Sequence, residues 1–226
     1  MRARALVLLS GGQDSTTCLA QALRDFPKQV EAVAFDYGQR HKIELKCAQK
    51  IARMADVSIK IINVKLLSQL TNNALTNSKL KIKTPKNKLP NTFVPGRNLL
   101  FLNLASIYAK QKGIKKIYMG VCQTDYSGYP DCRDEFIRSC NQTLNLALDD
   151  ELEIITPLMW LTKAETVKLM QDLGCLDWLK YSHTCYYGKR PACGECPACR
   201  LRKKGFEEAG VKDPMGSKLQ FSVKKL

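Results

Sequence analysis

Short apolar runs alternate with amphipathic segments along the first two thirds of the chain. A buried strand is predicted at Ala5 to Leu9, and further strands are predicted at Val30 to Phe35, Val57 to Val64, Ile117 to Val121 and Glu153 to Thr156. Helical spacing is found over Ser15 to Leu23, Ile43 to Ile51, Asn98 to Ala109 and Asp131 to Leu148. Such alternation is typical of a parallel sheet covered on both faces, so we predict a doubly wound α/β fold. Ligands bind such sheets at the carboxyl ends of the strands, where the strand order reverses.

Two features interrupt this regular pattern. The stretch from Thr71 to Asn91 is rich in Asn, Thr, Lys and Pro, and it is too long and polar for a simple connection. A change of composition near Ser182 separates a cysteine-rich tail from the rest. We therefore predict a nucleotide-binding catalytic domain over residues 1–182 and a small metal-binding subdomain over residues 183–226. The segment from Lys203 to Leu226 carries no motif.

A loop suited to phosphate binding follows the first predicted strand. Its residues are Ser10, Gly11, Gly12, Gln13, Asp14, Ser15 and Thr16. Two glycines permit backbone turns that let successive N–H groups converge on phosphate oxygens beside a helix N-terminus. Ser10 and Ser15 can donate hydroxyl hydrogen bonds, and Asp14 can hold Mg²⁺ or orient the loop. An ordinary strand-to-helix turn capped by Asp14 or Ser15 is the alternative, and the two common nucleotide motifs, G-x-x-x-x-G-K and G-x-G-x-x-G, are missing.

Three polar strings, at residues 35–41, 94–98 and 120–136, each follow a predicted strand or enter a helix. We expect them to meet the phosphate loop in one crevice at the carboxyl edge of the sheet. A planar, negatively charged substrate could stack there on Tyr126 or Tyr129 and pair its charge with Arg97 or Arg133. His41 lies in the first string, and we expect a structural role for it in the wall, with proton transfer as the alternative.

Four cysteines in the tail, Cys185, Cys193, Cys196 and Cys199, have the spacing of metal ligands. Four thiolates fit a tetrahedral, structural Zn²⁺. An iron–sulfur cluster is the rival, although the Cys-x3-Cys-Pro step of ferredoxins is missing. The remaining cysteines are expected to be small buried apolar residues, with a nucleophilic role for Cys122 or Cys132 as the alternative. They are Cys18, Cys47, Cys122, Cys132, Cys140 and Cys175.

The string Ser-Gly-Gly-x-Asp-Ser after the first strand resembles the PP-loop ATP pyrophosphatases, which cleave ATP between the α and β phosphates. Together with the three polar strings, Thr156 to Trp160 and the cysteine tail, the chain from Leu6 to about Arg202 resembles the QueC branch of that family. The resemblance implies structural zinc and an ATP-dependent carbon–nitrogen ligase in queuosine biosynthesis, with Mg²⁺ accompanying ATP. Its substrates would be 7-carboxy-7-deazaguanine and ammonia, its product the nitrile. The catalytic residues would be Asp14, Ser15, Arg97, Asp131 and Arg133.

The chain has 36 basic and 21 acidic residues, a net charge of +15 that invites a nucleic-acid hypothesis. Much of this charge lies in the lysine-bearing stretch from Lys79 to Lys88, which is typical of a solvated face. We therefore expect no direct contact with nucleic acid. A PP-loop enzyme that modifies tRNA directly stays open, as does a non-enzymatic zinc-ribbon protein with a vestigial loop.

No apolar run approaches the ~20 residues that span a bilayer, and the run at Ala5 to Leu9 ends without a cleavage site. A cytoplasmic location without membrane contact is the expectation. Ten cysteines in such a chain are not expected to form disulfides, because that compartment is reducing. A homodimer is compatible with the sequence.

Overall fold

The computed structural model describes residues 3–83, 88–124 and 128–216. Its centre is an all-parallel sheet in the order β3-β2-β1-β4-β5. The strands are β1 (Ala5–Leu8), β2 (Val30–Asp36), β3 (Ser58–Asn63), β4 (Lys116–Tyr118) and β5 (Glu153–Ile155). The order reverses between β1 and β4, because the chain first builds outward from β1 to β3 and then resumes on the other side of β1. The predicted doubly wound α/β fold is confirmed.

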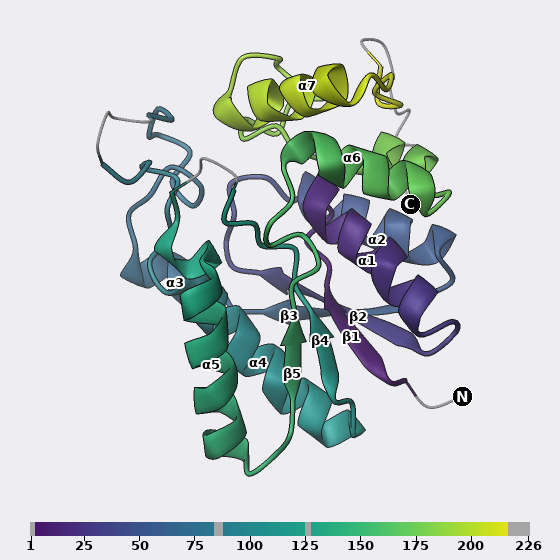
Figure 1. Ribbon diagram of the computed structural model, residues 1–226. Coiled ribbons are helices and arrows are strands. Elements are labelled where there is room, and N and C mark those ends of the chain that lie inside the picture. Colours follow the sequence, from purple (N-terminus) through teal and green to yellow (C-terminus); the bar gives the residue numbers. More distant parts are fainter. Residues whose placement is uncertain (1–2, 84–87, 125–127, 217–226) are drawn as a thin grey trace.

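Strand β1 is buried on both faces, because its side chains alternate between two helical layers. Ala5 and Val7 pack with α1 (Gln13–Asp25) and α2 (Ile43–Met54). Leu6 and Leu8 pack with α4 (Arg97–Lys112) and α5 (Asp134–Leu148). Figure 1 shows these two layers on opposite sides of the sheet. A continuous apolar run, rather than an alternating one, is therefore what the sequence needs at β1.

The end of one predicted strand and the start of one predicted helix differ from the structure, and one short helix is additional. Strand β4 ends at Tyr118 instead of Val121, because the chain then turns so that Gly120 packs against the backbone of Asp14. The helix expected over Asp131 to Leu148 is divided into a 3-10 turn, η1 (Pro130–Cys132), and α5, with Arg133 extended between them. Asp131 holds this break in place, since its carboxylate accepts a hydrogen bond from the backbone N–H of Asn98. The short helix α3 (Leu66–Leu70) was not expected.

The last third of the chain contains helices that the sequence pattern did not predict. These are α6 (Lys163–Asp172), the 3-10 helix η2 (Leu176–Tyr181) and α7 (Pro197–Ala209). Phe206 of α7 packs in one cluster with Val167 and Met170 of α6 and with Ala20 of α1. The Arg202 guanidinium of α7 also donates to the carbonyl of Leu179 in η2, at 3.1 Å. The cysteine-rich tail is thus docked on the sheet domain, and Figure 1 shows α7 lying across α6.

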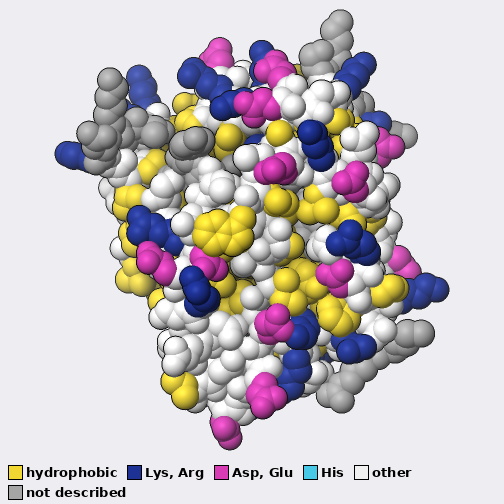
Figure 2. Space-filling view, in the orientation of Figure 1, with side chains coloured by type: hydrophobic (Ala, Val, Ile, Leu, Met, Phe, Trp, Pro, Cys, Tyr) yellow, Lys and Arg dark blue, Asp and Glu magenta, His cyan; other side chains and the backbone are white. Residues whose placement is uncertain are grey.

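The surface mixes charges of both signs. On the face shown in Figure 2, Lys and Arg side chains are interspersed with Asp and Glu and do not gather into one basic patch. Within the parts of the chain that the structure describes, no helix is both long enough and apolar enough to cross a bilayer.

Candidate active site

A cavity of about 490 Å³ opens at the carboxyl edge of the sheet. Its floor is formed by the ends of β1, β2 and β4, which include the point where the strand order reverses. The phosphate loop, all three polar strings and the cysteine tail contribute to its walls. The structure therefore brings together the segments that the sequence pattern expected to converge, and it adds the tail as a further wall.

The phosphate loop turns sharply into α1. Gly11 has φ +83°, and a Cβ added there would lie 2.3 Å from the carbonyl oxygen of Glu44, so the position requires glycine. The hydroxyls of Ser10 and Ser15 lie 3.0 Å apart, and Ser15 donates to the carbonyl of Gly12. Helix α1 begins at Gln13, which places its unpaired N–H groups at the cavity. This geometry suits an anion.

Five of the seven loop residues line the cavity: Ser10, Gly12, Gln13, Asp14 and Ser15. Gly11 and Thr16 instead shape the loop. The carbonyl of Gly11 accepts a hydrogen bond from the N–H of His183, and the hydroxyl of Thr16 donates to the carbonyl of Gly12. Gln13 is buried, and within the described structure its Nε2 has no hydrogen-bond partner. Its amide is therefore available to a ligand.

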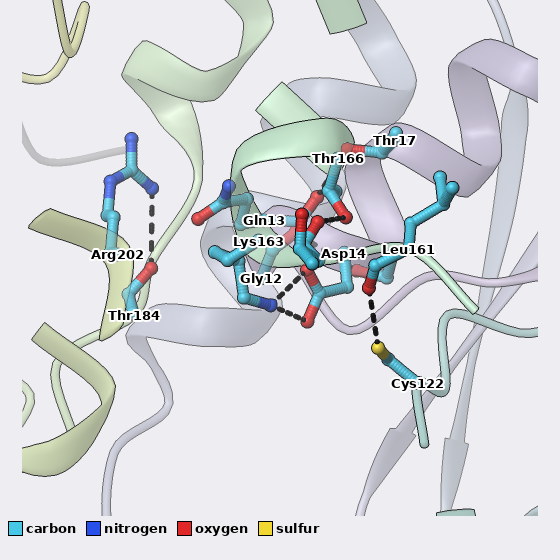
Figure 3. A network of polar contacts seen from close by, with 12 residues as sticks. Gly12, Gln13, Asp14, Thr17, Cys122, Leu161, Lys163, Thr166, Thr184 and Arg202 are labelled. Atoms are coloured by element: carbon cyan, nitrogen blue, oxygen red, sulfur yellow. Dashed lines mark hydrogen bonds and ion pairs between the residues drawn. The ribbon is translucent and has the colours of Figure 1, made fainter. Parts of the chain in front are cut away.

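Asp14 does not stand alone, because Lys163 at the start of α6 reaches across to it. The Lys163 Nζ lies 2.8 Å and 2.9 Å from the two carboxylate oxygens of Asp14. Figure 3 shows the lysine pointing from α6 toward the loop. Lys163 is nearly buried and lines the cavity, yet the sequence pattern did not single it out. With both oxygens engaged by an ammonium group, Asp14 fits poorly as a Mg²⁺ ligand.

Arg97, the first residue of α4, lies opposite the loop and lines the cavity. Its guanidinium lies 5.9 Å from the centre of the Tyr37 ring. Burial alone would lower the pKa of Arg97, but attraction to Tyr37 and Asp131 outweighs it and the pKa lies above its usual range. Arg97 is thus a fixed positive charge suited to a carboxylate.

Asp131 and Arg133 were both expected in the site, and neither lines the cavity among the residues described. Asp131 is buried behind Arg97, where desolvation raises the pKa of its carboxyl group and the Arg97 charge opposes that rise. Its Oδ2 accepts from the Asn98 N–H at 3.2 Å. The Arg133 side chain is half exposed and faces Glu135 at 3.3 Å. Asp131 therefore supports Arg97 from behind, whereas the Arg133 side chain points away from the cavity.

Of the two tyrosines expected to stack on the substrate, Tyr126 lies outside the described residues and Tyr129 lines the cavity. The Tyr129 hydroxyl lies 2.6 Å from that of Thr92, and its ring stacks on Phe93 with centroids 5.7 Å apart. The ring is held in one orientation by these two contacts. It is a rigid apolar surface beside Arg97.

Glu44 also lines the cavity and was missed, although it lies only three residues beyond the first polar string. Burial raises the pKa of its carboxyl group to about 7, and the charge of Arg97 acts in the opposite direction. Burial likewise raises the pKa of Tyr37 to about 12, so that phenol stays protonated. Glu44 is an acidic group in a cavity otherwise suited to anions.

The four tail cysteines lie together, with all their Sγ atoms within 4.8 Å of one another. The Sγ atoms of Cys193 and Cys199 are 3.9 Å apart, which is far longer than a disulfide and close to the roughly 3.8 Å edge of a tetrahedral Zn–S₄ site. The Cys196 N–H donates to the Cys193 sulfur at 3.3 Å. The donor set and spacing fit a tetrahedral metal ion.

Residues of the module with the four cysteines also face the cavity. Thr184, Tyr186, Pro197, Leu201 and Arg202 line it. Figure 3 shows Thr184 and Arg202 joined by a hydrogen bond. The module is therefore part of the cavity wall.

Both histidines join this module to the catalytic domain. The His41 Nε2 lies 2.9 Å from the carbonyl oxygen of Tyr186, which supports the expected structural role. His183 contacts the carbonyl of Cys185 in the same way, at 2.8 Å, and burial lowers its pKa to about 4. Desolvation lowers the pKa of His41 as well. Both rings are therefore neutral at pH 7.

Cys122 and Cys132 line the cavity, whereas Cys18, Cys47 and Cys140 do not; Cys122 is nevertheless buried, as these three are. Desolvation, with the charge of Asp131, raises the pKa of Cys132 to about 12. A thiol with such a pKa is not a nucleophile at pH 7, since the thiolate is the reactive form. The Cys122 Sγ donates to the carbonyl of Leu161 at 3.1 Å. These contacts favour the packing role over the nucleophilic one.

The sequence profile of the family described as "Queuosine biosynthesis protein QueC" matches residues 4–210. The chain belongs to the QueC family. It is 50% identical over 227 residues to a 7-cyano-7-deazaguanine synthase of Chromobacterium violaceum, covering 99% of this chain and 97% of the relative. Synthases of the same name from Bacillus subtilis and Clostridium acetobutylicum are 54% and 56% identical, over 91% of this chain and 94% of each relative.

Membership of the QueC family gives the chain a role in queuosine biosynthesis as an enzyme. The two alternatives, direct modification of tRNA and a non-enzymatic zinc-ribbon protein, are not favoured by these relatives. Within this QueC chain, Glu44 and Lys163 are the cavity residues that sequence reasoning missed. The signal for Lys163 was the Thr-x-x-Glu string at residues 162–165, which marks a helix start.

Proposed function

We propose that this chain is an ATP-dependent ligase that converts 7-carboxy-7-deazaguanine and ammonia to 7-cyano-7-deazaguanine, with release of AMP and pyrophosphate. The observation that carries the proposal is that the phosphate loop and Arg97 face one cavity of about 490 Å³. The wall formed by the phosphate loop suits the phosphates of ATP. The wall formed by Arg97 and Tyr129 suits a carboxylate on a planar ring. The relatives are named for this product.

The chemistry begins with activation of the substrate carboxylate. Oxide is a very poor leaving group, so a carboxylate oxygen first attacks the α-phosphate of ATP and pyrophosphate departs. Ammonia then replaces AMP to give the amide. A second adenylation, on the amide oxygen, allows loss of AMP and two protons to give the nitrile. No covalent bond to the enzyme is needed at any stage.

The chain's own contribution is positioning and charge. The N–H groups at the start of α1 and the hydroxyls of Ser10 and Ser15 stabilise the charge that grows on pyrophosphate, an effect of the oxyanion-hole kind. Lys163, held at the loop by Asp14, adds a positive charge at the same place. Arg97 orients the carboxylate, and Tyr129 supports the planar ring. When bound with ATP, Mg²⁺ would lower the charge of the phosphates that the loop receives.

The proposed resident metal is one structural Zn²⁺, held by Cys185, Cys193, Cys196 and Cys199. Four thiolate ligands leave no open coordination position, so the ion stabilises the module and takes no part in the reaction. Iron in stoichiometric amount would support the iron–sulfur rival instead.

The experiment supplies the purified protein with ATP, ammonia and 7-carboxy-7-deazaguanine and identifies the nucleotides and bases by mass spectrometry. AMP, pyrophosphate and the nitrile are expected. ADP as the main nucleotide product would refute the assignment of the loop, because the loop lacks the lysine that G-x-x-x-x-G-K motifs place on the β and γ phosphates.

Variants of the loop test the same assignment. Asp14→Ala and Ser15→Ala should each lower the rate of AMP release at least 100-fold, because both residues fix the loop that receives pyrophosphate. Ser139→Ala, at an exposed position of α5, is the matched control and should keep the full rate. Metal content should stay at one ion per chain in all three proteins.

A further inference from the structure

One acidic side chain in the cavity is not explained by ATP or by a carboxylate substrate. Glu44 lies in the first turn of α2 and lines the cavity. Its backbone packs against Gly11 of the phosphate loop, while its carboxyl group lies within the electrostatic influence of Arg97. Glu44 therefore lies between the place where pyrophosphate departs and the place where the carboxylate is held.

The Glu44 carboxylate has no ion-pair partner within 4.0 Å among the residues of the described ranges. The charged or titratable groups that act on it or feel it are Arg97 from α4, Tyr37 after β2, and Cys47 on its own helix. Arg97 attracts it without forming a salt bridge, and the tyrosine and the cysteine carry no charge at pH 7. The Glu44 side chain is partly exposed to the cavity, and where its carboxyl group is ionised, above about pH 7, its negative charge attracts a small cation.

The proposed reaction needs such a cation. Ammonia in neutral water is almost entirely ammonium, which has no lone pair and cannot attack an acyl adenylate. The enzyme must therefore bind ammonium and remove a proton from it beside the activated carbon. A carboxylate next to the phosphate loop and the carboxylate-binding arginine meets both requirements.

We propose that Glu44 is a catalytic residue that binds ammonium and accepts the proton whose loss makes it a nucleophile. This inference rests on the proposed function. One N–H proton passes to the Glu44 carboxylate, and the nitrogen lone pair then forms the bond to the acyl carbon. The bond from that carbon to the AMP oxygen breaks, and AMP leaves with the electron pair. The nitrogen releases a second proton to water, and so does Glu44.

The environment of Glu44 suits proton exchange near neutral pH. Burial raises the pKa of its carboxyl group to about 7, so the carboxylate can take up a proton and lose it again within one catalytic cycle. Three tyrosines, Tyr37, Tyr129 and Tyr186, also line the cavity, but the ring of Tyr37 lies under the Arg97 guanidinium and that of Tyr129 is stacked on Phe93, so Glu44 is the group we assign to the ammonium ion.

Separate half-reactions distinguish this role from a general loss of function. Exchange of labelled pyrophosphate into ATP, in the presence of 7-carboxy-7-deazaguanine, reports adenylate formation and needs no ammonia. Glu44→Gln should leave this exchange within about threefold of wild type, while ammonia-dependent product formation falls at least 100-fold. Glu151→Gln, an exposed acid-to-amide control before β5, should retain both activities.

Hydroxylamine supplies a second nucleophile, which is largely unprotonated at neutral pH and so needs no base to become reactive. Glu44→Gln should form the hydroxamate from the adenylate at close to the wild-type rate. Parallel loss of exchange and hydroxamate formation would overturn the assignment and point to a role of Glu44 in ATP binding. Absence of exchange in the wild-type protein would instead refute the proposed function itself.

A measurement on the unmodified enzyme avoids any doubt about the folding of a variant. If Glu44 binds ammonium, kcat/KM for total ammonia should stay nearly constant between about pH 7.5 and 8.5, because ammonium remains the main species there. An enzyme that takes up only free ammonia would show kcat/KM rising about tenfold over that unit of pH. The second result would contradict the inference.

Discussion

At the scale of single residues, the raised pKa of Glu44 predicts how stability depends on pH. The carboxyl group titrates near 4.5 in the unfolded chain and at about 7 in the folded protein. Between these values the unfolded chain has released the proton and the folded protein still holds it, so rising pH favours unfolding. Wild-type stability is therefore lost through this window, on the order of 3 kcal/mol by pH 8.

Glu44→Gln removes this titration and should be more stable than wild type at pH 8. The two proteins should unfold alike at pH 4, where the carboxyl group is neutral in both states. Urea titrations at the two pH values measure the difference, with Glu151→Gln as the control. Equal stability of wild type and Glu44→Gln at both pH values would mean that Glu44 is well solvated, contrary to its position in the cavity.

Residues within a local motif could be predicted from the sequence, and residues placed by the tertiary fold could not. Ser10, Ser15 and Arg97 follow a strand or start a helix, so the rule for parallel sheets places them correctly. Lys163 reaches Asp14 from 149 positions away in the chain, and no local pattern encodes that contact. Arg133 illustrates the opposite error, since its string enters the site while its own side chain faces solvent.

At the scale of elements, the cap at the start of α6 should affect both the stability of the protein and the position of Lys163. The Thr162 hydroxyl accepts from the N–H of Glu165, and the Glu165 carboxylate accepts from the N–H of Thr162, which together form a capping box. Thr162→Ala removes half of it and should lower the free energy of unfolding by about 1 kcal/mol. Because Lys163 is the next residue, the KM for ATP should also rise.

Thermal unfolding and initial rates at varied ATP test this expectation. The drop in Tm should be about 2 to 4 °C for a chain of this length. Thr143→Ala, at an exposed site inside α5, is the control and should be neutral or slightly stabilising, because alanine favours helix interiors. An unchanged KM for ATP in Thr162→Ala would show that the cap does not position Lys163.

Apart from the short α3, the strands and helices of the first two thirds of the chain were predicted, and the helices of the last third were missed. Strands β1 and β2 and helices α1, α2, α4 and α5 contribute buried apolar side chains to the core, whereas β3 and β5 are only partly buried. Helix α7 has a polar sequence, with Phe206 as its buried aromatic residue, and it is held by α6 and by the metal-binding module. Its stability comes from tertiary contacts, which sequence periodicity does not record.

At the scale of the whole molecule, the module with the four cysteines couples metal binding to the cavity. Because Tyr186, Pro197 and Leu201 line the cavity, loss of the metal should open this wall as well as destabilise the module. Cys196→Ser should therefore lower metal content, Tm and the affinity for ATP together. Cys175→Ser, at a half-buried cysteine outside the four-cysteine cluster, is the control for removal of a thiol.

Metal analysis, thermal unfolding and ATP titration of the reduced protein give the three readouts. Freshly purified wild type should hold one zinc ion per chain. If Cys196→Ser lacked the metal but bound ATP normally, the metal would not be needed to keep this wall of the cavity in place. That result would contradict the prediction drawn from the position of Tyr186 and Leu201 in the cavity lining.

The net charge of +15 is also a property of the whole molecule. It raises the question of whether the substrate is the free base or tRNA, which the salt dependence of activity can answer. An enzyme that contacts several phosphates loses affinity steeply with salt, by about 0.9 in log K per log salt for each phosphate on duplex. A deazapurine with one carboxylate, which we propose is held by Arg97, makes too few ionic contacts for such a slope. Figure 2 shows basic and acidic side chains intermixed on the face displayed, which also gives no continuous track for a polyanion.

We therefore expect kcat/KM for the free base to change less than about threefold between low and physiological salt, whereas a tRNA substrate contacting several phosphates would show a loss of roughly 100-fold or more. Arg97→Ala should abolish turnover of the free base without changing any weak retention of tRNA in a gel-shift assay, because Arg97 is buried in the cavity and cannot reach a helical backbone. Saturable modification of tRNA in an assay without free base would contradict this expectation. The charge of Arg97 lies inside the cavity, so its removal should affect turnover of the free base. Retention of tRNA by surface charge should be unaffected, so the two assays distinguish a role of the cavity from a role of the surface.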